Sequence, residues 1–313
     1  QGIPPACHSW HRMTMWAYLY PYSEQPTLWQ LLTRSDPVTL DQFFWNTSGG
    51  WGGVTLTAEE KKGFSSVPYM VCPSRRSTPA SVEYQSAGNG QSSVGPCSDY
   101  CLIASTDSNS DFNGRATAQS VDNHYYVRVF SVFTENRQTY QKGFFRGAVN
   151  PTGTEGNTKS NPRDTFSRVV DGLSNQIVVG EKHIPIDGLN VCNNSPSFDN
   201  VSTFASCHDC SYLCGAEATG CGSVLRCVAT YWSDDHKIPY CGVANGIDGP
   251  YDHLVANDRN GSNAAINCGL GSWHAGGCNV LKGDGSVSFM SATTPQTILG
   301  YLATVDDGNT QSN

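Results

Sequence analysis

The chain has 313 residues, which is enough for one large domain or two modest ones with an ample core. Its 19 Lys and Arg residues stand against 27 Asp and Glu residues, for a net charge of -8, and no basic run is present, which argues against nucleic-acid binding. Charged residues make up only 15% and glycine contributes 32 residues, a composition typical of a loop-rich, β-leaning protein. The adjacent pairs Lys61-Lys62 and Arg75-Arg76 are expected on the solvated surface.

The first third of the chain predicts short helices. The aromatic segment 16–20 predicts a helix or a strand, and three leucines after Pro26 have helical spacing. Thr57 followed by Glu60 is a capping-box pattern, which predicts a short surface helix. Residues 67–73 are expected to form a strand.

Strand signals dominate the rest of the chain. Residues 124–133 alternate and are rich in aromatic and β-branched types, so they predict a strand. Residues 176–179, which follow a turn, predict a buried strand. Residues 279–281 and 286–290 flank a glycine-rich turn, which predicts a β-hairpin. A C-terminal helix is expected to begin with Thr294 as its N-cap.

Thirteen cysteines are many for a chain with so little charge. An exported protein pairs its cysteines whereas a cytosolic one keeps them reduced, so the number indicates a location outside the cytoplasm. The disulfide candidates are Cys192, Cys207, Cys210, Cys214, Cys221, Cys227, Cys241, Cys268 and Cys278. Zinc is the alternative for Cys207-x-x-Cys210, because the spacing suits a metal site and His208 is adjacent.

These patterns together predict one α+β domain over residues 1–313. It is expected to have an antiparallel β-sheet, many loops and a cysteine-dense insertion at residues 188–241. No signal peptide is recognisable, and the longest apolar runs fall far short of the ~20 residues that a membrane-spanning helix needs. Because the cysteines indicate export, we expect the chain to begin after a removed targeting segment.

The spacing of His274 and Asp284 raises three interpretations. Nine residues separate the two in the stretch "SWHAGGCNVLKGDGSVSFMS", and they could form a catalytic pair, a metal site or an architectural signature. We favour architecture, because Asp284 suits a turn position and His274 stands beside two glycines, where it can hydrogen-bond a turn.

Catalytic motifs are missing from the sequence. It contains no nucleophile elbow, no His-Glu-x-x-His and no phosphate loop, so we expect no enzyme activity. The charged triplet at residues 181–183 follows a buried strand, and we expect it to be a strand end that returns to solvent.

Calcium is the ligand that the loop "DSNSDFNG" suggests. Asp107, Asn109, Asp111 and Asn113 alternate as the oxygen ligands of a calcium loop do. Phe112 stands where an EF-type loop needs glycine, and no bidentate Glu follows, so an Asx-rich solvated loop is the ordinary alternative. Ca²⁺ is thus a candidate cofactor, and no cofactor is certain.

Five stretches, in order along the chain, carry a family resemblance. They are "MWAYLYPYSEQPTLW", "YMVCPSRR", "CSDYCLIAS", "VVDGLSNQIVVGEKHIP" and "WHAGGCNVLKGDGSVSFMS". They resemble the motifs of the prepilin-type "processing-associated" H-X9-DG proteins, a pilin-like group of planctomycete-type bacteria. The motif positions are His274, Asp284, Gly285, Asp171, Gly172, Asn175, Gly180 and Glu181. Tyr20 replaces the Leu that the family has before its proline.

The resemblance implies a pilin-like globular domain. Family precursors carry a short leader, a prepilin-peptidase site and a hydrophobic N-terminal helix, and "GIPPA" resembles the start of their globular domain. The chain is therefore expected to be the globular part without that helix. The cysteines between Cys207 and Cys227 are denser than in the family pattern.

Two functions follow as hypotheses. The first is an extracellular or cell-surface structural subunit, which self-assembles into a homo-oligomer or filament and acts by association rather than turnover. The alternative is an extracellular carbohydrate- or ligand-binding module that holds a glycan through exposed tryptophans and Asx-rich loops. The N-terminal tryptophans supply either core or contact surface. A hydrolase is a third hypothesis, with no motif to favour it.

Overall fold

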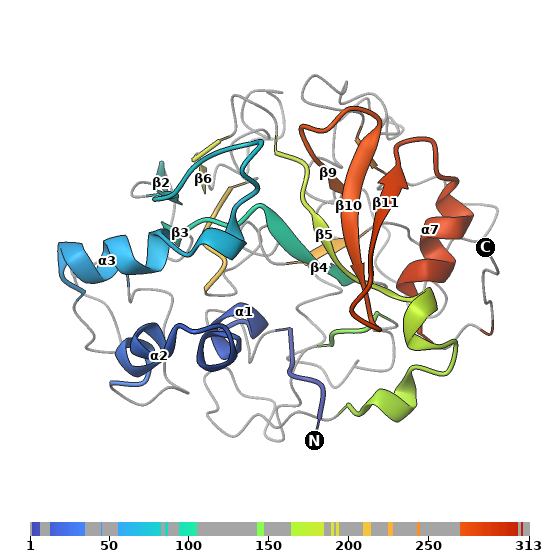
Figure 1. Ribbon diagram of the computed structural model, residues 1–313, viewed down its shortest axis with the longest axis horizontal. Coiled ribbons are helices and arrows are strands. Elements are labelled where there is room, and N and C mark those ends of the chain that lie inside the picture. Colours follow the sequence, from blue (N-terminus) through green and yellow to red (C-terminus); the bar gives the residue numbers. More distant parts are fainter. Residues whose placement is uncertain are drawn as a thin grey trace, which may run out of the picture.

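The computed structural model combines short helices with one five-stranded sheet, so the fold is α+β, as the sequence predicts (Figure 1). The strand order is β11-β10-β5-β4-β7, and all neighbours are antiparallel except β4 and β7. The described residues are 2–6, 13–34, 45, 56–82, 85–86, 94–104, 143–146, 164–184, 189–190, 192–193, 209–213, 225–227, 243–244, 270–305 and 308.

The central sheet contains the buried strand predicted over residues 176–179, which the structure places at Ile177–Glu181. Its strands are β4 (Tyr100–Ala104), β5 (Ile177–Glu181), β7 (Leu225–Cys227), β10 (Gly277–Lys282) and β11 (Val287–Ser291). In β5, the middle strand, every residue except Val179 is buried, because both faces of the strand are covered. Strand β7 comes from segment 188–241, so part of that segment joins the sheet. Most of it lies outside the described residues, and the cysteine-dense insertion stays a prediction.

Strands β10 and β11 form the predicted hairpin, paired from Gly277 with Ser291 to Leu281 with Val287. At the turn, Gly285 has φ +86°, a conformation that glycine adopts without strain. At the open end of the hairpin, Gly277 has φ +157°, and a Cβ there would lie 2.0 Å from the Met290 carbonyl oxygen. The two strands can approach this closely only because residue 277 has no side chain.

Short helices gather on the side of the molecule away from α7 (Figure 1). They are α1 (Met15–Tyr18), η1 (Tyr20–Tyr22), α2 (Pro26–Leu32), α3 (Ala58–Ser65) and η3 (Pro68–Met70). The capping box predicted for α3 is confirmed, because the Thr57 and Glu60 side chains each accept a hydrogen bond from the other's backbone N–H. The strand predicted over 67–73 is wrong. Pro68 lacks the N–H that a strand would donate, and the chain turns into a 3-10 helix there instead.

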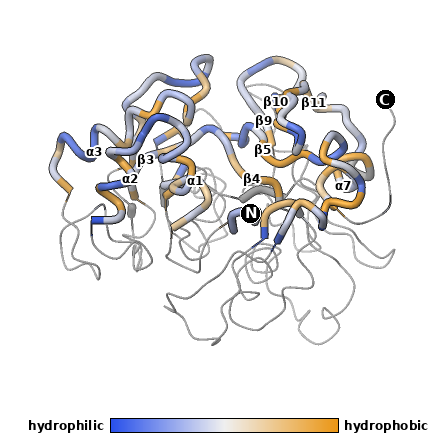
Figure 2. The backbone as a smooth tube through the Cα atoms, turned by 60° about the horizontal axis from the view of Figure 1, so that its bottom comes forward, coloured by the Kyte–Doolittle hydropathy of each residue, from blue (hydrophilic) through white to orange (hydrophobic). Residues whose placement is uncertain are grey.

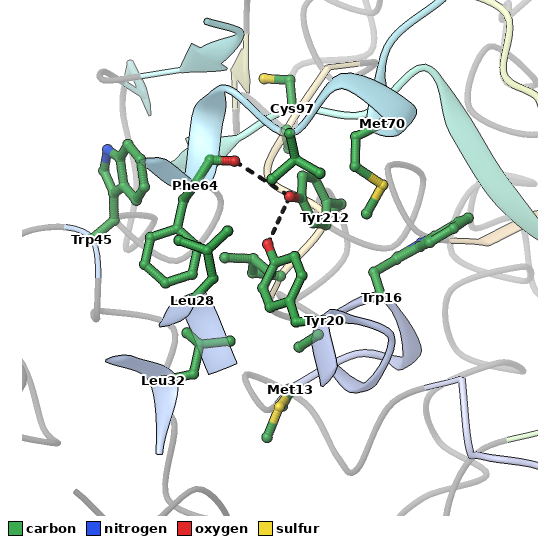
Figure 3. Close-up of a cluster of buried hydrophobic side chains, with 14 of the residues drawn as sticks. Met13, Trp16, Tyr20, Leu28, Leu32, Trp45, Phe64, Met70, Cys97 and Tyr212 are labelled. Atoms are coloured by element: carbon green, nitrogen blue, oxygen red, sulfur yellow. Dashed lines mark hydrogen bonds between the residues drawn. The ribbon is translucent and has the colours of Figure 1, made fainter. Parts of the chain in front are cut away.

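A large hydrophobic cluster joins these helices to a distant segment (Figure 3). Tyr212 lies fully buried among them, and its hydroxyl group lies 2.7 Å from the Tyr20 hydroxyl and 3.5 Å from the Phe64 carbonyl oxygen. Trp16 and Trp45 are also buried in this cluster, as the core interpretation of the tryptophans expects. These two side chains are therefore not available for glycan contact.

A second cluster packs helix α7 (Gln296–Ala303) against the sheet. Leu299 and Ala303 of the helix join Ile177 and Val280 of the sheet, and Figure 2 shows the hydrophobic stretches of β4, β5 and α7. The helix begins one residue later than the sequence predicts. Its N-cap is Pro295, with no side-chain capping bond, so the prediction of Thr294 as the cap is wrong.

The remaining elements are short. They are β1 (Ser81–Val82), β2 (Gln85–Ser86), β3 (Gly95–Pro96), η7 (Phe166–Arg168), η8 (Leu173–Asn175), β6 (Cys192–Asn193), β8 (Val243–Ala244) and β9 (Leu270–Gly271). The strand predicted over 124–133 lies outside the described residues. Within the described part of the chain, no helix has the length and apolar character needed to cross a membrane.

Candidate functional site

Three side chains from distant motifs meet at one end of the sheet. Cys72 follows η3, Glu181 is the last residue of β5, and His274 lies in the turn that leads into β10. His274 Nε2 lies 3.7 Å from Cys72 Sγ and 3.6 Å from Glu181 Oε1. One ligand atom from each residue lies within 4.8 Å of the others. Each of these residues thus offers a different donor element, sulfur, oxygen or nitrogen, to one small volume.

The turn that carries His274 is fixed on both sides. The Ser272 hydroxyl accepts a hydrogen bond from the His274 N–H at 3.0 Å and donates one to the Gly277 carbonyl at 2.8 Å. The neighbouring Trp273 indole donates to the Ile184 carbonyl at 3.0 Å. The His274 side chain remains 35% exposed, so the site is reachable from solvent.

Hydrogen bonds also hold the Glu181 side chain and the Cys72 backbone. The Asn279 N–H donates to Glu181 Oε2 at 2.7 Å, which leaves Oε1 toward His274. The Cys72 N–H donates to Asp99 Oδ2 at 2.7 Å. Burial raises the pKa of the Cys72 thiol, and the nearby Glu181 charge raises this pKa further. A thiol with a raised pKa is a poor nucleophile at neutral pH.

The contacts of His274 also argue against a catalytic relay. In a nucleophile–His–acid triad, the nucleophile and the acid use different ring nitrogens of the histidine. Here Cys72 Sγ and Glu181 Oε1 both approach the same nitrogen, Nε2. This convergence is typical of a ligand set around a common point. The chemistry that the arrangement supports is the binding of a cation.

A buried network of charges lies beside this site. Arg75 Nη1 donates to Asp99 at 3.0 Å, and Arg76 contacts both Asp99 and Asp209. Lys182 Nζ lies 3.8 Å from Asp209. Burial alone would raise the pKa of Asp209, but the Arg76 and Lys182 charges hold this pKa below its ordinary value. The network ties four segments of the chain together.

Two sequence expectations about charged residues are corrected by this network. The Arg75 and Arg76 side chains are 0% and 6% exposed rather than solvated, because Asp99 and Asp209 neutralise them. Arg75 also donates to the Lys182 and Gly271 carbonyls at 2.9 and 3.0 Å. The triplet 181–183 does not return to solvent, since all of its side chains are buried. Buried charges persist when they are paired and hydrogen-bonded in this way.

Asp284 lies away from the site that contains His274. The two residues stand at opposite ends of strand β10, whose six residues span roughly 17–20 Å at about 3.3 Å each. Asp284 Oδ1 accepts hydrogen bonds from the N–H and the hydroxyl of Ser286, at 2.9 and 2.7 Å, inside the hairpin turn. The turn role predicted for Asp284 and Gly285 therefore agrees with the structure, whereas His274 contacts other motifs.

The other motif residues stabilise backbone turns or allow close packing of strands. The Asn175 side chain donates to the Asp171 carbonyl at 2.8 Å, around Gly172 with φ +91°, and Asp171 Oδ1 accepts the Gly308 N–H at 3.1 Å. A Cβ on Gly180 would lie 2.9 Å from the Leu270 side chain, so the glycine lets β9 pack against β5. None of these contacts belongs to the Cys72–Glu181–His274 site.

The cysteine predictions have mixed outcomes. Cys210 is disulfide-bonded, so it is not a zinc ligand of the Cys207-x-x-Cys210 type. Cys278 carries a free, fully buried thiol, which corrects its place among the disulfide candidates. Its partner across the hairpin is Met290, which offers no thiol. The side chains of the other candidates, Cys192, Cys207, Cys214, Cys221, Cys227, Cys241 and Cys268, lie outside the described residues, and so does the calcium loop of Asp107, Asn109, Asp111 and Asn113.

Strand β11 presents an apolar surface at the edge of the sheet. It stands last in the strand order, and within the described residues it pairs only with β10. The Val287 and Phe289 side chains are 68% and 54% exposed. Because Val287 and Phe289 share one face and Ser286 and Ser288 the other, the sequence predicts a half-buried strand with the two apolar residues on one face. The structure exposes that face, and the buried side chain of the strand is Met290, which packs in the cluster with α7.

A comparison with protein families identifies the class of this chain. A family model described as "Protein of unknown function (DUF1559)" matches residues 3–297. The chain belongs to this family, which is the planctomycete-type H-X9-DG group that its motifs resemble. The searches of curated proteins and of solved structures found no match.

Proposed function

We propose that this protein is an exported, pilin-like structural subunit that assembles with copies of itself at the cell surface or in an extracellular filament. The observation that carries the proposal is the apolar edge of strand β11. Membership of the H-X9-DG group, with its resemblance to pilins, supports the same function. The Cys210 disulfide supports an oxidising location, since disulfides persist in exported proteins.

Strand β11 has the properties of an assembly edge. An edge strand leaves backbone N–H and C=O groups that can pair with another chain, and proteins usually protect such edges with charges, proline or bulges. Strand β11, "VSFMS", has no charged residue and no proline, and it exposes Val287 and Phe289 instead. A second copy that pairs along this strand would bury both side chains and extend the sheet. Because each copy carries the same edge, two copies can pair through it, and a longer assembly needs a second, different contact on each copy.

The test is the association state of the 313-residue chain with intact disulfides. We expect sedimentation velocity and negative-stain electron microscopy to find oligomers or filaments of the natural sequence. Phe289→Lys should shift the protein toward monomers, because a charge on the apolar edge opposes strand pairing.

Tyr22→Lys is the matched control for this test. Tyr22 is 88% exposed but lies in η1, away from the edge strand, so this variant should assemble normally. A monomeric natural protein over the whole accessible concentration range, or a Phe289→Lys variant that assembles as well as the control, would contradict the proposal.

A further inference from the structure

We propose that Cys72, Glu181 and His274 bind one zinc ion. The proposal concerns a metal site and is independent of the proposed self-assembly. It rests on the convergence of a thiol, a carboxylate and an imidazole from three distant segments, with ligand atoms within 4.8 Å of one another. Among the residues that the structure describes, this is the one group of His, Cys, Asp and Glu side chains with that property.

The separations of the ligand atoms suit a tetrahedral ion. Zinc with Zn–S of about 2.3 Å and Zn–N and Zn–O of about 2.0–2.1 Å places sulfur and nitrogen about 3.6 Å apart, and nitrogen and oxygen about 3.3 Å apart. The observed separations from His274 Nε2 are 3.7 Å to Cys72 Sγ and 3.6 Å to Glu181 Oε1. The third pair, the Cys72 and Glu181 ligand atoms, lies within 4.8 Å, so the three donors close around the ion as it binds.

The surrounding hydrogen bonds orient these donors as the outer shell of a metal site does. The Asn279 N–H occupies Glu181 Oε2, so Oε1 is the oxygen that faces the histidine. The Ser272 hydroxyl holds the His274 backbone, and Asp99 holds the Cys72 backbone. Such outer-shell contacts fix ligand orientation, and their loss typically weakens metal binding about 10–100-fold.

The donor set selects zinc over calcium. Calcium and magnesium take oxygen ligands, whereas a thiolate with an imidazole and one carboxylate suits Zn²⁺. A Cys72 thiolate beside the Glu181 carboxylate places two negative charges together, and a divalent cation offsets their repulsion. Three protein donors leave one coordination position for water, and the exposed part of His274 provides the route from solvent.

The experiment is a zinc titration of the purified chain, treated with chelator and kept free of thiol reductants. Competition with a chromophoric chelator should give one Zn²⁺ per chain. Loss of a ligand should weaken binding more than loss of an outer-shell contact does, so His274→Ala and Cys72→Ser should each lower the zinc affinity by about 100-fold or more. Glu181→Gln should also weaken it, since the single amide oxygen cannot serve both the Asn279 N–H and the metal.

Two control variants separate this site from other cysteines and from the rest of the motif. Cys97→Ser removes a buried free thiol elsewhere, and Asp284→Ala removes the distant carboxylate of the H-X9-DG motif. Both should bind zinc as the natural protein does. Co²⁺ in place of zinc should give thiolate-to-metal charge-transfer absorption that disappears in Cys72→Ser.

His274→Ala decides the question if Cys72→Ser fails to fold, because the partly exposed imidazole can be removed without opening the core. Its circular dichroism without metal should match that of the natural protein. A natural protein that binds no zinc would overturn the proposal. So would a folded His274→Ala variant that keeps the natural zinc affinity, or cobalt bound without a thiolate band.

Discussion

His274 and Cys72, 202 positions apart in the chain, bring Nε2 and Sγ to 3.7 Å. The histidine of the H-X9-DG motif therefore contacts Cys72 of the motif "YMVCPSRR" and Glu181 of the motif "VVDGLSNQIVVGEKHIP". It does not contact Asp284, the aspartate of its own motif. The motif has two separate tasks, one at each end of strand β10. His274 contributes a donor to a shared site, while Asp284 and Gly285 build the hairpin turn.

Substitutions at the two ends of β10 should rank in a definite order when the metal-free protein is unfolded in urea. Gly285→Val should cost the most, roughly 2 kcal/mol, because a β-branched residue is strained at φ +86°. His274→Ala should cost about 1 kcal/mol, since the half-buried imidazole loses polar partners. Asp284→Ala should cost least, because its carboxylate is fully exposed. A larger loss from Asp284→Ala than from Gly285→Val would contradict the assigned turn.

Two neighbouring glycines offer a second stability test. Gly277→Ala should destabilise the protein by roughly 3 kcal/mol or more, because the new Cβ would lie 2.0 Å from the Met290 carbonyl oxygen and the hairpin must open. Gly276→Ala should cost only about 1–2 kcal/mol, since its φ of +85° is strained but its Cβ meets nothing within 4 Å. Thermal unfolding of both variants measures the difference. Equal losses would mean that β10 and β11 are not this close.

The buried ion network predicts a strong effect at Asp209. Asp209→Asn should destabilise the protein by roughly 3–5 kcal/mol at neutral pH, because Arg76 and Lys182 lose a buried countercharge. Asp284→Asn, at an exposed carboxylate, is the control and should change little.

The pH dependence of this effect has a fixed sign. The pKa of Asp209 is lower in the folded protein than in the unfolded chain, so its contribution is complete above the unfolded value of about 3.9. The contribution is lost as pH falls from there through the folded pKa. The gap in unfolding free energy between the natural protein and Asp209→Asn should therefore narrow below about pH 4. A gap that widens on acidification would contradict the assigned ion pairs.

Local chemistry accounts for the elements that the sequence predicts correctly. The β10–β11 hairpin depends on alternation and a glycine-rich turn, and the cap of α3 depends on Thr57 and Glu60 three positions apart. Three consecutive apolar residues in β5 predict a buried strand, and in the structure both faces of this strand are covered. Each of these patterns involves residues a few positions apart, so the sequence alone is enough to predict the element.

The Cys72–Glu181–His274 site and the buried ion network depend on contacts between residues far apart in the sequence, which no local pattern predicts. Cys72 meets His274 through the packing of η3 beside the turn before β10, and Glu181 arrives through the register of β5 against β10. Arg76 looks like a surface residue until Asp209, 133 positions away, is brought against it. Long-range pairing of this kind explains why the predictions of solvent exposure for residues 75–76 and 181–183 are wrong.

The last prediction concerns the reactivity of four buried cysteines. Cys72, Cys97, Cys101 and Cys278 are buried thiols, and burial raises the pKa of Cys97 and of Cys278. Because alkylating reagents attack the thiolate, these thiols should stay unmodified in the native protein. Unfolding in denaturant without reductant should expose all of them, whereas Cys210 should react only after reduction.

Mass mapping of alkylated peptides distinguishes these outcomes, and we expect it to find most cysteines from Cys192 to Cys241 bonded as well. Native alkylation of Cys278, or reaction of Cys210 before reduction, would show that the packing or the disulfide assigned to that residue is wrong.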